Sequence, residues 1–342
     1  MSETGTVNPK LAHVVSEWKH DRPMNGVRID PQARYVVGVS EDAVASRFQL
    51  SDGTRTVLSG GFQGWGRALA YSTGGRYVVT GSTDGKITWW ETAADTPEPL
   101  RTTVAHNGWV RSMDNSPDGS LIATGGNDNV VRVWNADSGE AVHELTGHES
   151  HIYSVLFHPN GKWLLSGDLK GVIRQWNLED GAEMRTFDAK KLYSYHGGQR
   201  VDYGGVRSLA VSPDGKWLAA GGLFEAPNPF AGVNKPLILL FDWESQEIKQ
   251  EHVTDAVERG VIWRMEWLAD GSLMGVTSGT AGMLLFWKPE TAGDFHRFKL
   301  PNHARDMDLH PDGLHVATAH HDRHVRIIRL AAKADTEAPT QE

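Results

Sequence analysis

The chain has 342 residues, no cysteine and a formal net charge of −9. These values exclude disulfide and thiolate chemistry, and they argue against a general nucleic-acid-binding protein, which would carry a basic surface. Because no stretch approaches the roughly 18 consecutive apolar residues of a membrane span and residues 1–10 lack the apolar segment of a secretion signal, we expect a cytoplasmic protein without membrane or nucleic-acid partners.

The predicted elements begin with a strand at residues 11–18, which precedes a series of similar turns. Three of the turns read Pro-Asp-Gly, in which proline fixes φ and glycine permits positive φ. The seven turns begin at Pro31, Thr73, Pro117, Pro159, Pro213, Ala269 and Pro311. The differences between these positions are 42, 44, 42, 54, 56 and 42 residues, and a period of about 40–45 residues is typical of one four-stranded propeller blade. We therefore predict seven blades.

The unit around the third turn shows the expected content of one blade. It contains an alternating run at 110–114, a run of small and β-branched residues at 121–126, and further extended segments at 130–134 and 140–145. None of these segments has helical periodicity. The chain is therefore predicted to be all-β and to form a single seven-bladed β-propeller with four-stranded antiparallel blades.

Two segments make the fifth unit longer than the others. Residues 188–203 form an enlarged loop before it, and residues 223–235 are inserted between its second and third strands. Their aromatic residues include Tyr193, Tyr195, Tyr203, Phe224 and Phe230. Long loops with aromatic side chains on a rigid scaffold are often functional. The alternative is that they pack on themselves and shield a blade edge.

The seventh unit lacks a fourth strand of its own. Its third strand is predicted at 325–330, and residues 331–342 are too polar to form another strand. Pairing of the strand at 11–18 with this last blade would close the ring and cover an open edge. We therefore predict a propeller at 11–330, flanked by a flexible segment at 1–10 and a disordered tail at 331–342.

The units resemble the repeats of the WD-repeat family. Tryptophans near the ends of the predicted third strands match the strand-three tryptophan of the family, and Ala105-His106 and Gly147-His148 match its Gly-His opening. These tryptophans are Trp90, Trp134, Trp176 and Trp287. The resemblance covers about residues 11–330, nearly the whole chain.

The resemblance also implies a hydrogen-bonded tetrad of side chains in the units that match best. In the third unit the tetrad is complete: His106, Thr124, Asp128 and Trp134. The fourth unit keeps three members and has Lys170 in place of the aspartate: His148, Ser166 and Trp176. The seventh unit also keeps three, with Ile328 in place of the tryptophan: His303, Thr318 and Asp322.

In this family the loops between blades open on one face of the ring, around the central tunnel. The residues expected to point toward this face lie eight and six positions before each turn. The position six before the turn is arginine in four units and aromatic in two more, and such residues dominate binding hot spots. The candidate partner-binding residues at these positions are Trp65, Arg67, Trp109, Arg111, His151, Tyr153, Arg207, Trp263 and Arg305. To these we add Tyr193, Tyr195, Phe224 and Phe230 from the long loops of the fifth unit.

Two interpretations of the arginines remain open. A convergent ring of arginines would favour a carboxylate-rich or phosphorylated segment, through bidentate, charge-assisted hydrogen bonds. Alternatively, each arginine pairs with an acidic residue of the neighbouring blade and is structural.

Histidine is frequent, and the densest cluster is at residues 320–324, with His303, His310 and His315 nearby in sequence. Successive residues of a strand point to opposite faces, so neighbouring histidines rarely share one ion. We therefore expect no metal site and no other cofactor. The sequence also lacks a phosphate-binding loop, a dinucleotide-binding glycine motif and a nucleophile elbow, so we expect no catalytic residues.

The expected function is that of a non-catalytic scaffold or adaptor, which binds an acidic or phosphorylated protein segment around the tunnel mouth. The chain would act as a monomer or as a subunit of a complex. Two alternatives remain: a propeller enzyme or small-molecule binder that uses the tunnel mouth, and a structural subunit whose rim sits in a larger assembly. The dependence of binding on ionic strength distinguishes the adaptor from the structural subunit, since docking through arginine weakens as ionic strength rises.

Overall fold

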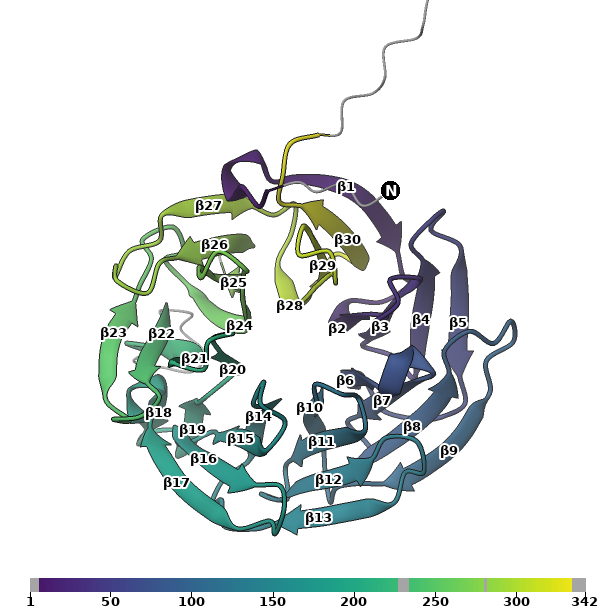
Figure 1. The fold of residues 1–342 in the computed structure, drawn as a ribbon, viewed down its shortest axis with the longest axis horizontal. Coiled ribbons are helices and arrows are strands. Elements are labelled where there is room, and N and C mark those ends of the chain that lie inside the picture. The colour runs from purple at the N-terminus through teal and green to yellow at the C-terminus, as the bar shows by residue number, and fades with distance from the viewer. Residues whose placement is uncertain (1–5, 227–233, 280–281, 334–342) are drawn as a thin grey trace, which may run out of the picture.

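The computed structural model describes residues 6–226, 234–279 and 282–333. Seven four-stranded antiparallel sheets are arranged as the blades of a ring around a central opening, as Figure 1 shows. The first strand of each blade borders the opening and the fourth forms the rim. The predicted all-β, seven-bladed propeller is confirmed.

The first three blades contain the following strands, in order from the centre to the rim. Blade one has β2 (Met24–Ile29), β3 (Tyr35–Ser40), β4 (Val44–Gln49) and β5 (Arg55–Ser59). Blade two has β6 (Gly66–Tyr71), β7 (Tyr77–Ser82), β8 (Lys86–Glu91) and β9 (Pro99–Val104). Blade three has β10 (Val110–Asn115), β11 (Leu121–Gly126), β12 (Val131–Asn135) and β13 (Ala141–Leu145).

The next three blades follow the same order. Blade four has β14 (Ile152–Phe157), β15 (Trp163–Asp168), β16 (Val172–Asn177) and β17 (Glu183–Asp188). Blade five has β20 (Ser208–Val211), β21 (Trp217–Phe224), β22 (Lys235–Asp242) and β23 (Ile248–His252). Blade six has β24 (Gly260–Trp267), β25 (Leu273–Gly279), β26 (Met283–Trp287) and β27 (His296–Lys299). Short 3-10 turns occur at Pro9–Leu11, Thr73–Gly75 and Lys190–Leu192.

The last blade combines both ends of the chain. Its strands are β28 (Ala304–Leu309), β29 (His315–His320), β30 (His324–Arg329) and, at the rim, β1 (His13–Lys19). The pairing of β1 with β30 is antiparallel and runs from His13 opposite Arg329 to Lys19 opposite His324. The predicted closure of the ring by an N-terminal strand is therefore confirmed, with the strand beginning two residues later than expected.

The ends of the chain pack further than the predicted flexible segment and tail suggest. Asn8 N–H donates to Leu330 O at 2.7 Å, and Val7 and Ala12 contact the core between the last two blades. Ala331 is buried as well. The predicted flexible segment also covers residues 1–5, and the predicted tail also covers residues 334–342. These residues lie outside the part of the chain that the structure describes.

The core lies between neighbouring blades, because each sheet is apolar on both faces. One cluster joins Val79, Ile87 and Trp89 of blade two to Met113 and Trp134 of blade three. Comparable clusters occur between the other blades. The aromatic residues that follow the turns pack against these clusters at Tyr77, Trp163 and Trp217.

The innermost strands of neighbouring blades are linked by hydrogen bonds from backbone to side chain rather than by backbone pairing. The N–H groups of Ile29, Phe157 and Leu309 donate to carboxylates of the preceding blade, namely Asp308 (2.7 Å), Asp114 (2.7 Å) and Glu266 (3.1 Å). Elsewhere a hydroxyl group is the acceptor in place of a carboxylate, as Ser208 Oγ accepts from Met265 N–H at 3.0 Å. These bonds satisfy strand edges that would otherwise face the channel without partners.

The tetrad of the third blade is present as predicted. His106 contacts Asp128 Oδ1 and Thr124 Oγ1 at 2.8 Å each, and Trp134 Nε1 donates to the same hydroxyl at 3.0 Å. All four side chains are thereby satisfied inside the blade.

Two other predicted tetrads need correction. In the fourth blade the carboxylate role belongs to Asp168, whose Oδ2 lies 2.9 Å from His148 Nδ1, so this tetrad is complete despite Lys170. In the seventh blade the imidazole beside Thr318 is that of His320, at 2.8 Å, whereas His303 Nδ1 accepts from Gly279 N–H. The side chain that fits is therefore not always the one at the expected position.

Candidate partner-binding site

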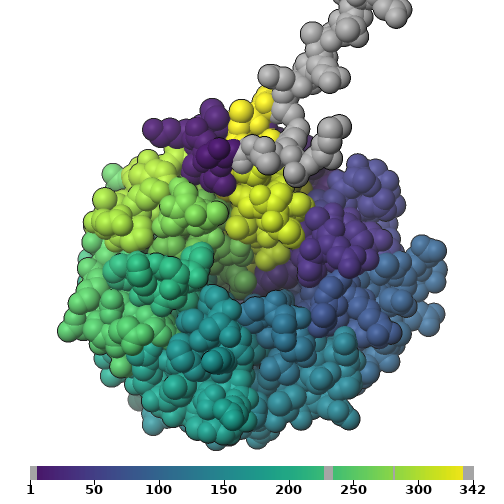
Figure 2. All heavy atoms as spheres, viewed as in Figure 1, coloured from purple at the N-terminus to yellow at the C-terminus, as the bar shows by residue number. Residues whose placement is uncertain are grey.

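The seven side chains six positions before the turns meet in the central channel. They surround a narrow cavity of about 80 Å³ that is open at its mouth. In the space-filling view, side chains fill most of the opening that separates the ribbons (Figure 2). The seven residues are Asn25, Arg67, Arg111, Tyr153, Arg207, Trp263 and Arg305.

A local feature of the backbone points these side chains inward. In six blades the residue concerned is the unpaired residue of a β-bulge, as for Arg111 between Val110 and Ser112. A bulge redirects a side chain without ending the strand. In blade five, Arg207 directly precedes β20 and its N–H donates to Gly221 O at 2.8 Å. The repeat therefore sets one inward-pointing residue per blade.

The arginines and aromatic rings alternate along an arc of the channel mouth. The Arg111 guanidinium lies 5.0 Å from the Trp109 ring centre and 4.4 Å from that of Tyr153. Arg207 lies 4.1 Å from the Tyr153 ring and 5.5 Å from the Trp263 ring. Arg67 lies 6.0 Å from Trp109 on its other side. Such stacks stabilise a guanidinium while its N–H edge stays available to a ligand.

Three of the four arginines have no acidic partner among the described residues. Arg305 pairs with Glu41 at 2.7 Å, as the structural interpretation expects. Arg67, Arg111 and Arg207 form no ion pair within the part of the chain that the structure describes. Across the same residues, the buried Nε atoms of Arg67 and Arg207 also lack a hydrogen-bond partner. We call these three residues the arginine triad.

The triad is an electrostatically unfavourable cluster in the free protein. Burial, followed by the positive charges of Arg111, Arg305 and Arg207, lowers the pKa of Arg67 to about 10. Burial likewise lowers the pKa values of Arg111 and Arg207. All three stay protonated at neutral pH, so an anion at the mouth would relieve both the repulsion and the missing hydrogen bonds.

A layer of paired charges lies behind the triad. Arg28 contacts Asp306 at 2.7 Å and Asp308 at 3.9 Å. Burial and the charge of Asp308 raise the pKa of Glu266 to about 8, and burial raises the pKa of Asp308 to about 6. Arg28, Glu266 and Asp308 lie three positions before their turns and Asp306 lies five before its turn, so the spacing that located the triad could also have located this layer. The carboxylates serve as acceptors for the next blade, so they are anchored structurally.

Substitution of Glu266 by glutamine should change how stability depends on pH. The folded-state pKa of Glu266, about 8, exceeds the unfolded value of about 4.3, so the folded chain holds a proton that the unfolded chain has lost. The free energy of unfolding should therefore fall as pH rises from about 6.5 to about 8, by up to roughly 2 kcal/mol, and Glu266→Gln should flatten this fall.

Chemical denaturation across that interval measures the slope. His320, whose pKa is lowered by burial to about 4, contributes below the interval, where stability is lost as pH falls. Glu244→Gln, at an exposed carboxylate, is the control and should keep the wild-type slope. Equal slopes for Glu266→Gln and the wild type would contradict the assignment.

The other predicted binding residues are more dispersed. Trp65 and Trp109 are on the surface, 47% and 38% exposed, and His151 donates from Nδ1 to Asn127 O at 2.7 Å. These three do not line the cavity, although the Trp109 ring stacks on two of its arginines.

The described parts of the two long segments of blade five lie away from the cavity. Residues 188–203, predicted as a loop, instead contain a 3-10 turn and a hairpin of β18 (Tyr193–His196) and β19 (Val201–Gly204), set back from the central opening in Figure 1. Tyr193 donates to Asp202 at 2.7 Å, and Tyr195 is 56% exposed. Phe224 ends β21, and Phe230 lies outside the described residues. The structure thus separates Tyr193, Tyr195 and Phe224 from the arginine triad.

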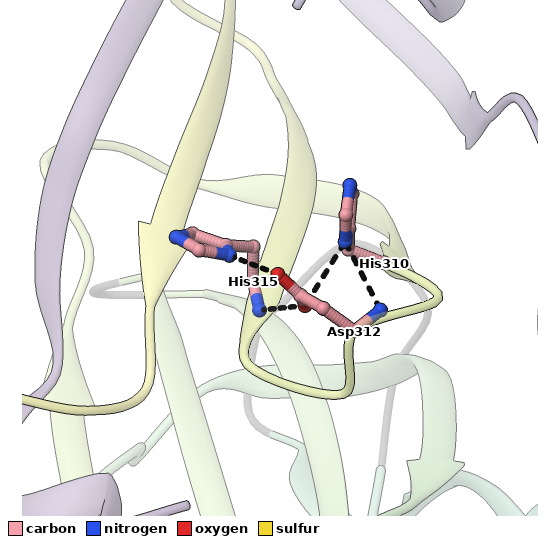
Figure 3. A group of neighbouring side chains, drawn as sticks. All are labelled: His310, Asp312 and His315. Atoms are coloured by element: carbon pink, nitrogen blue, oxygen red, sulfur yellow. Dashed lines mark hydrogen bonds and ion pairs between the residues drawn. The ribbon is translucent and has the colours of Figure 1, made fainter. Parts of the chain in front are cut away.

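One group of side chains has the composition of a metal site. His310, Asp312 and His315 surround the turn between β28 and β29, and their possible ligand atoms lie within 4.8 Å of one another (Figure 3). The sequence argument considered only neighbours along a strand, and it therefore missed residues that a turn brings together.

Among the described residues, no helix is long and apolar enough to cross a membrane. The repeat family described as WD domain, G-beta repeat (WD40) matches residues 51–91, 97–135, 139–177, 190–223 and 296–329, together more than half of the chain. No curated protein matches the chain. Propellers of this family generally act as scaffolds for protein–protein interaction and are typically non-catalytic. From the matched repeats and the seven blades, the chain belongs to the WD40 family.

Proposed function

We propose that the protein is a non-catalytic adaptor, whose arginine triad binds an acidic or phosphorylated segment of a partner protein at the channel mouth. The observation that carries the proposal is the absence, among the described residues, of any acidic partner for Arg67, Arg111 and Arg207. Arginines whose role is structural would be paired, as Arg305 is with Glu41.

The chemistry of the triad favours an oxyanion. Guanidinium groups donate in a planar fork that matches a carboxylate or a phosphate, and partly desolvated donors strengthen such bonds. The rings of Trp109, Tyr153 and Trp263 hold the arginines in place, so little side-chain entropy is lost on binding. The exposed Trp65 adds apolar area beside the mouth.

The layer behind the triad limits how deep a negative ligand can reach. Asp306 lines the same cavity and Asp308 follows it on the innermost strand β28, and both would repel a second anionic group. We therefore expect the partner to insert one anionic side chain, with its flanking residues lying across the blade tops.

A peptide array of matched phosphorylated, glutamate-containing and neutral segments tests the proposal. Wild-type protein should retain a set of anionic peptides and bind their neutral counterparts weakly. The variant Arg67→Gln/Arg111→Gln/Arg207→Gln should lose that set, because each engaged arginine contributes about 1.5–3 kcal/mol.

The matched control removes three other stacked arginines. Arg76, Arg101 and Arg185 lie over Tyr77, Trp89 and Trp243, at 4.8, 5.3 and 4.7 Å, outside the channel. Their replacement by glutamine changes net charge equally and should leave the array pattern intact. Retention of the same peptides by the triad variant would refute the proposal.

A further inference from the structure

The turn between β28 and β29 differs from the equivalent turns of the other blades. The turn aspartate binds a serine hydroxyl in blades three and five, through Ser116 and Ser212 at 2.6 Å each. In blade seven, Asp312 lies between two imidazoles: its Oδ1 is 2.9 Å from His310 Nδ1 and its Oδ2 is 2.7 Å from His315 Nδ1 (Figure 3).

The Nδ1 atom of His310 faces both a hydrogen-bond donor and a hydrogen-bond acceptor. This atom lies 3.1 Å from Asp312 N, the geometry in which it accepts a backbone hydrogen bond, and His158 makes the same contact with Asn160 in blade four. One ring nitrogen cannot accept from that N–H and also donate to Asp312 Oδ1. A neutral His310 uses its Nδ1 lone pair for Asp312 N–H and has no proton for Asp312 Oδ1, so an ion bound by Nδ1 and Oδ1 would replace that backbone hydrogen bond and join the two atoms.

The spacing of the polar atoms suits a transition-metal ion. Metal–nitrogen and metal–oxygen bonds of about 2.0–2.2 Å place neighbouring ligand atoms roughly 3 Å apart. The two imidazoles contact different oxygens of Asp312, at 2.9 and 2.7 Å, and one ligand atom from each of the three residues lies within 4.8 Å of the others, so small side-chain rotations would bring them to this separation. Two imidazoles and one carboxylate are ligands that zinc and other late first-row ions accept.

The carboxylate is held in place. Asp312 Oδ1 accepts from the N–H groups of Leu314 and His315, at 2.8 and 3.1 Å. The turn therefore fixes the position of the carboxylate, whereas His310 would exchange its bond from Asp312 N–H for the ion.

The surroundings are apolar and lie at the seam of the ring. The three side chains open into a hollow formed by β1, β30 and blade one, where the ring closes. Its other lining residues are Val15, Ser16, Ile29, Ala33, Leu50 and Ile327. A mostly apolar wall weakens competition from water and strengthens the electrostatic attraction of a bound ion.

We propose that His310, Asp312 and His315 bind one divalent late first-row transition-metal ion, such as Zn²⁺, at the seam of the propeller. Three protein ligands leave the remaining coordination positions to water. The ion would stabilise the turn beside the closing strand. This site is independent of the arginine triad.

Titration of the untagged protein with Co²⁺, followed by visible absorption, and with Zn²⁺, followed by calorimetry, tests the proposal. The repeat itself supplies variants that fit the fold: His315→Leu copies Leu121 and Leu273, and His310→Ser copies Ser116. Wild type should bind one ion per chain, and each variant should weaken binding by at least about tenfold.

His158→Ser is the matched control, because His158 occupies the same turn position without a carboxylate beside it. It should bind the ion as the wild type does. Zn²⁺ should also raise the thermal midpoint of the wild type and of His158→Ser, but not that of His315→Leu. Equal binding by wild type and both site variants, or no binding by folded wild type, would overturn the proposal.

Discussion

Deletion of residues 1–19 is expected to unfold the propeller rather than to trim one edge. The deletion removes all of β1, exposes the edge of β30 and removes Trp18, which stacks on Phe48 of blade one at 5.5 Å. It also removes Val7 and Val14 from the core between the last two blades. Because the closing strand joins both ends of the ring, we expect a loss of at least about 3 kcal/mol, together with aggregation through the open edge.

Thermal denaturation and analytical ultracentrifugation measure this outcome. A synthetic peptide of residues 1–19 should restore the thermal midpoint when it is added to the truncated chain. Val15→Ala, at an exposed position of the same strand, is the control and should stay close to wild type. A truncated monomer with the wild-type midpoint would show that the ring does not depend on β1.

Asp306→Ala should be the most damaging single substitution inside the channel. Asp306 Oδ2 accepts from Val27 N–H at 3.0 Å and from Arg28 Nη1 at 2.7 Å. Although burial disfavours the charge of Arg28, Asp306 and Asp308 outweigh burial and raise its pKa. Removal of Asp306 leaves a backbone donor unpaired and leaves the buried Arg28 with the more distant Asp308 at 3.9 Å, which should cost about 3–5 kcal/mol in the free energy of unfolding.

Urea denaturation checks this value. Asp306→Asn keeps an acceptor and loses the charge, so its free energy of unfolding should lie between those of Asp306→Ala and the wild type. Asp137→Ala, at an exposed turn, is the comparison and should change little. If Asp306→Ala unfolded within about 0.5 kcal/mol of wild type, the inner carboxylates would not link the blades as described.

The sequence predicts the fold well because its signals are local and repeated. The Pro-Asp-Gly turns and the strand-three tryptophans recur with one period, and each acts within its own blade. The inward-pointing arginines could be located for the same reason, since the bulge that directs Arg67, Arg111 and Arg305 lies at a constant distance before each turn.

Features that depend on the reach of individual atoms could not be predicted in this way. Asp168 and His320 replace the expected tetrad members, because residues near a strand end can reach the same partner from different positions. Whether an arginine of the channel finds an acidic partner depends on the side chains of the neighbouring blade. Arg305 pairs with Glu41 beside blade one, whereas Arg67 has no such partner among the described residues. The approach of His310 to His315 depends on the curvature of one turn.

The central claim is that the arginine triad is a binding site for an anionic protein segment. The most direct test is a fluorescence-polarisation titration of labelled phosphoserine peptides against wild type, the triad variant Arg67→Gln/Arg111→Gln/Arg207→Gln, and the control Arg76→Gln/Arg101→Gln/Arg185→Gln. We predict saturable binding by wild type and control that weakens as salt increases, and a loss of at least about a hundredfold in the folded triad variant. Equal affinity of all three proteins, or an affinity independent of salt, would contradict the account.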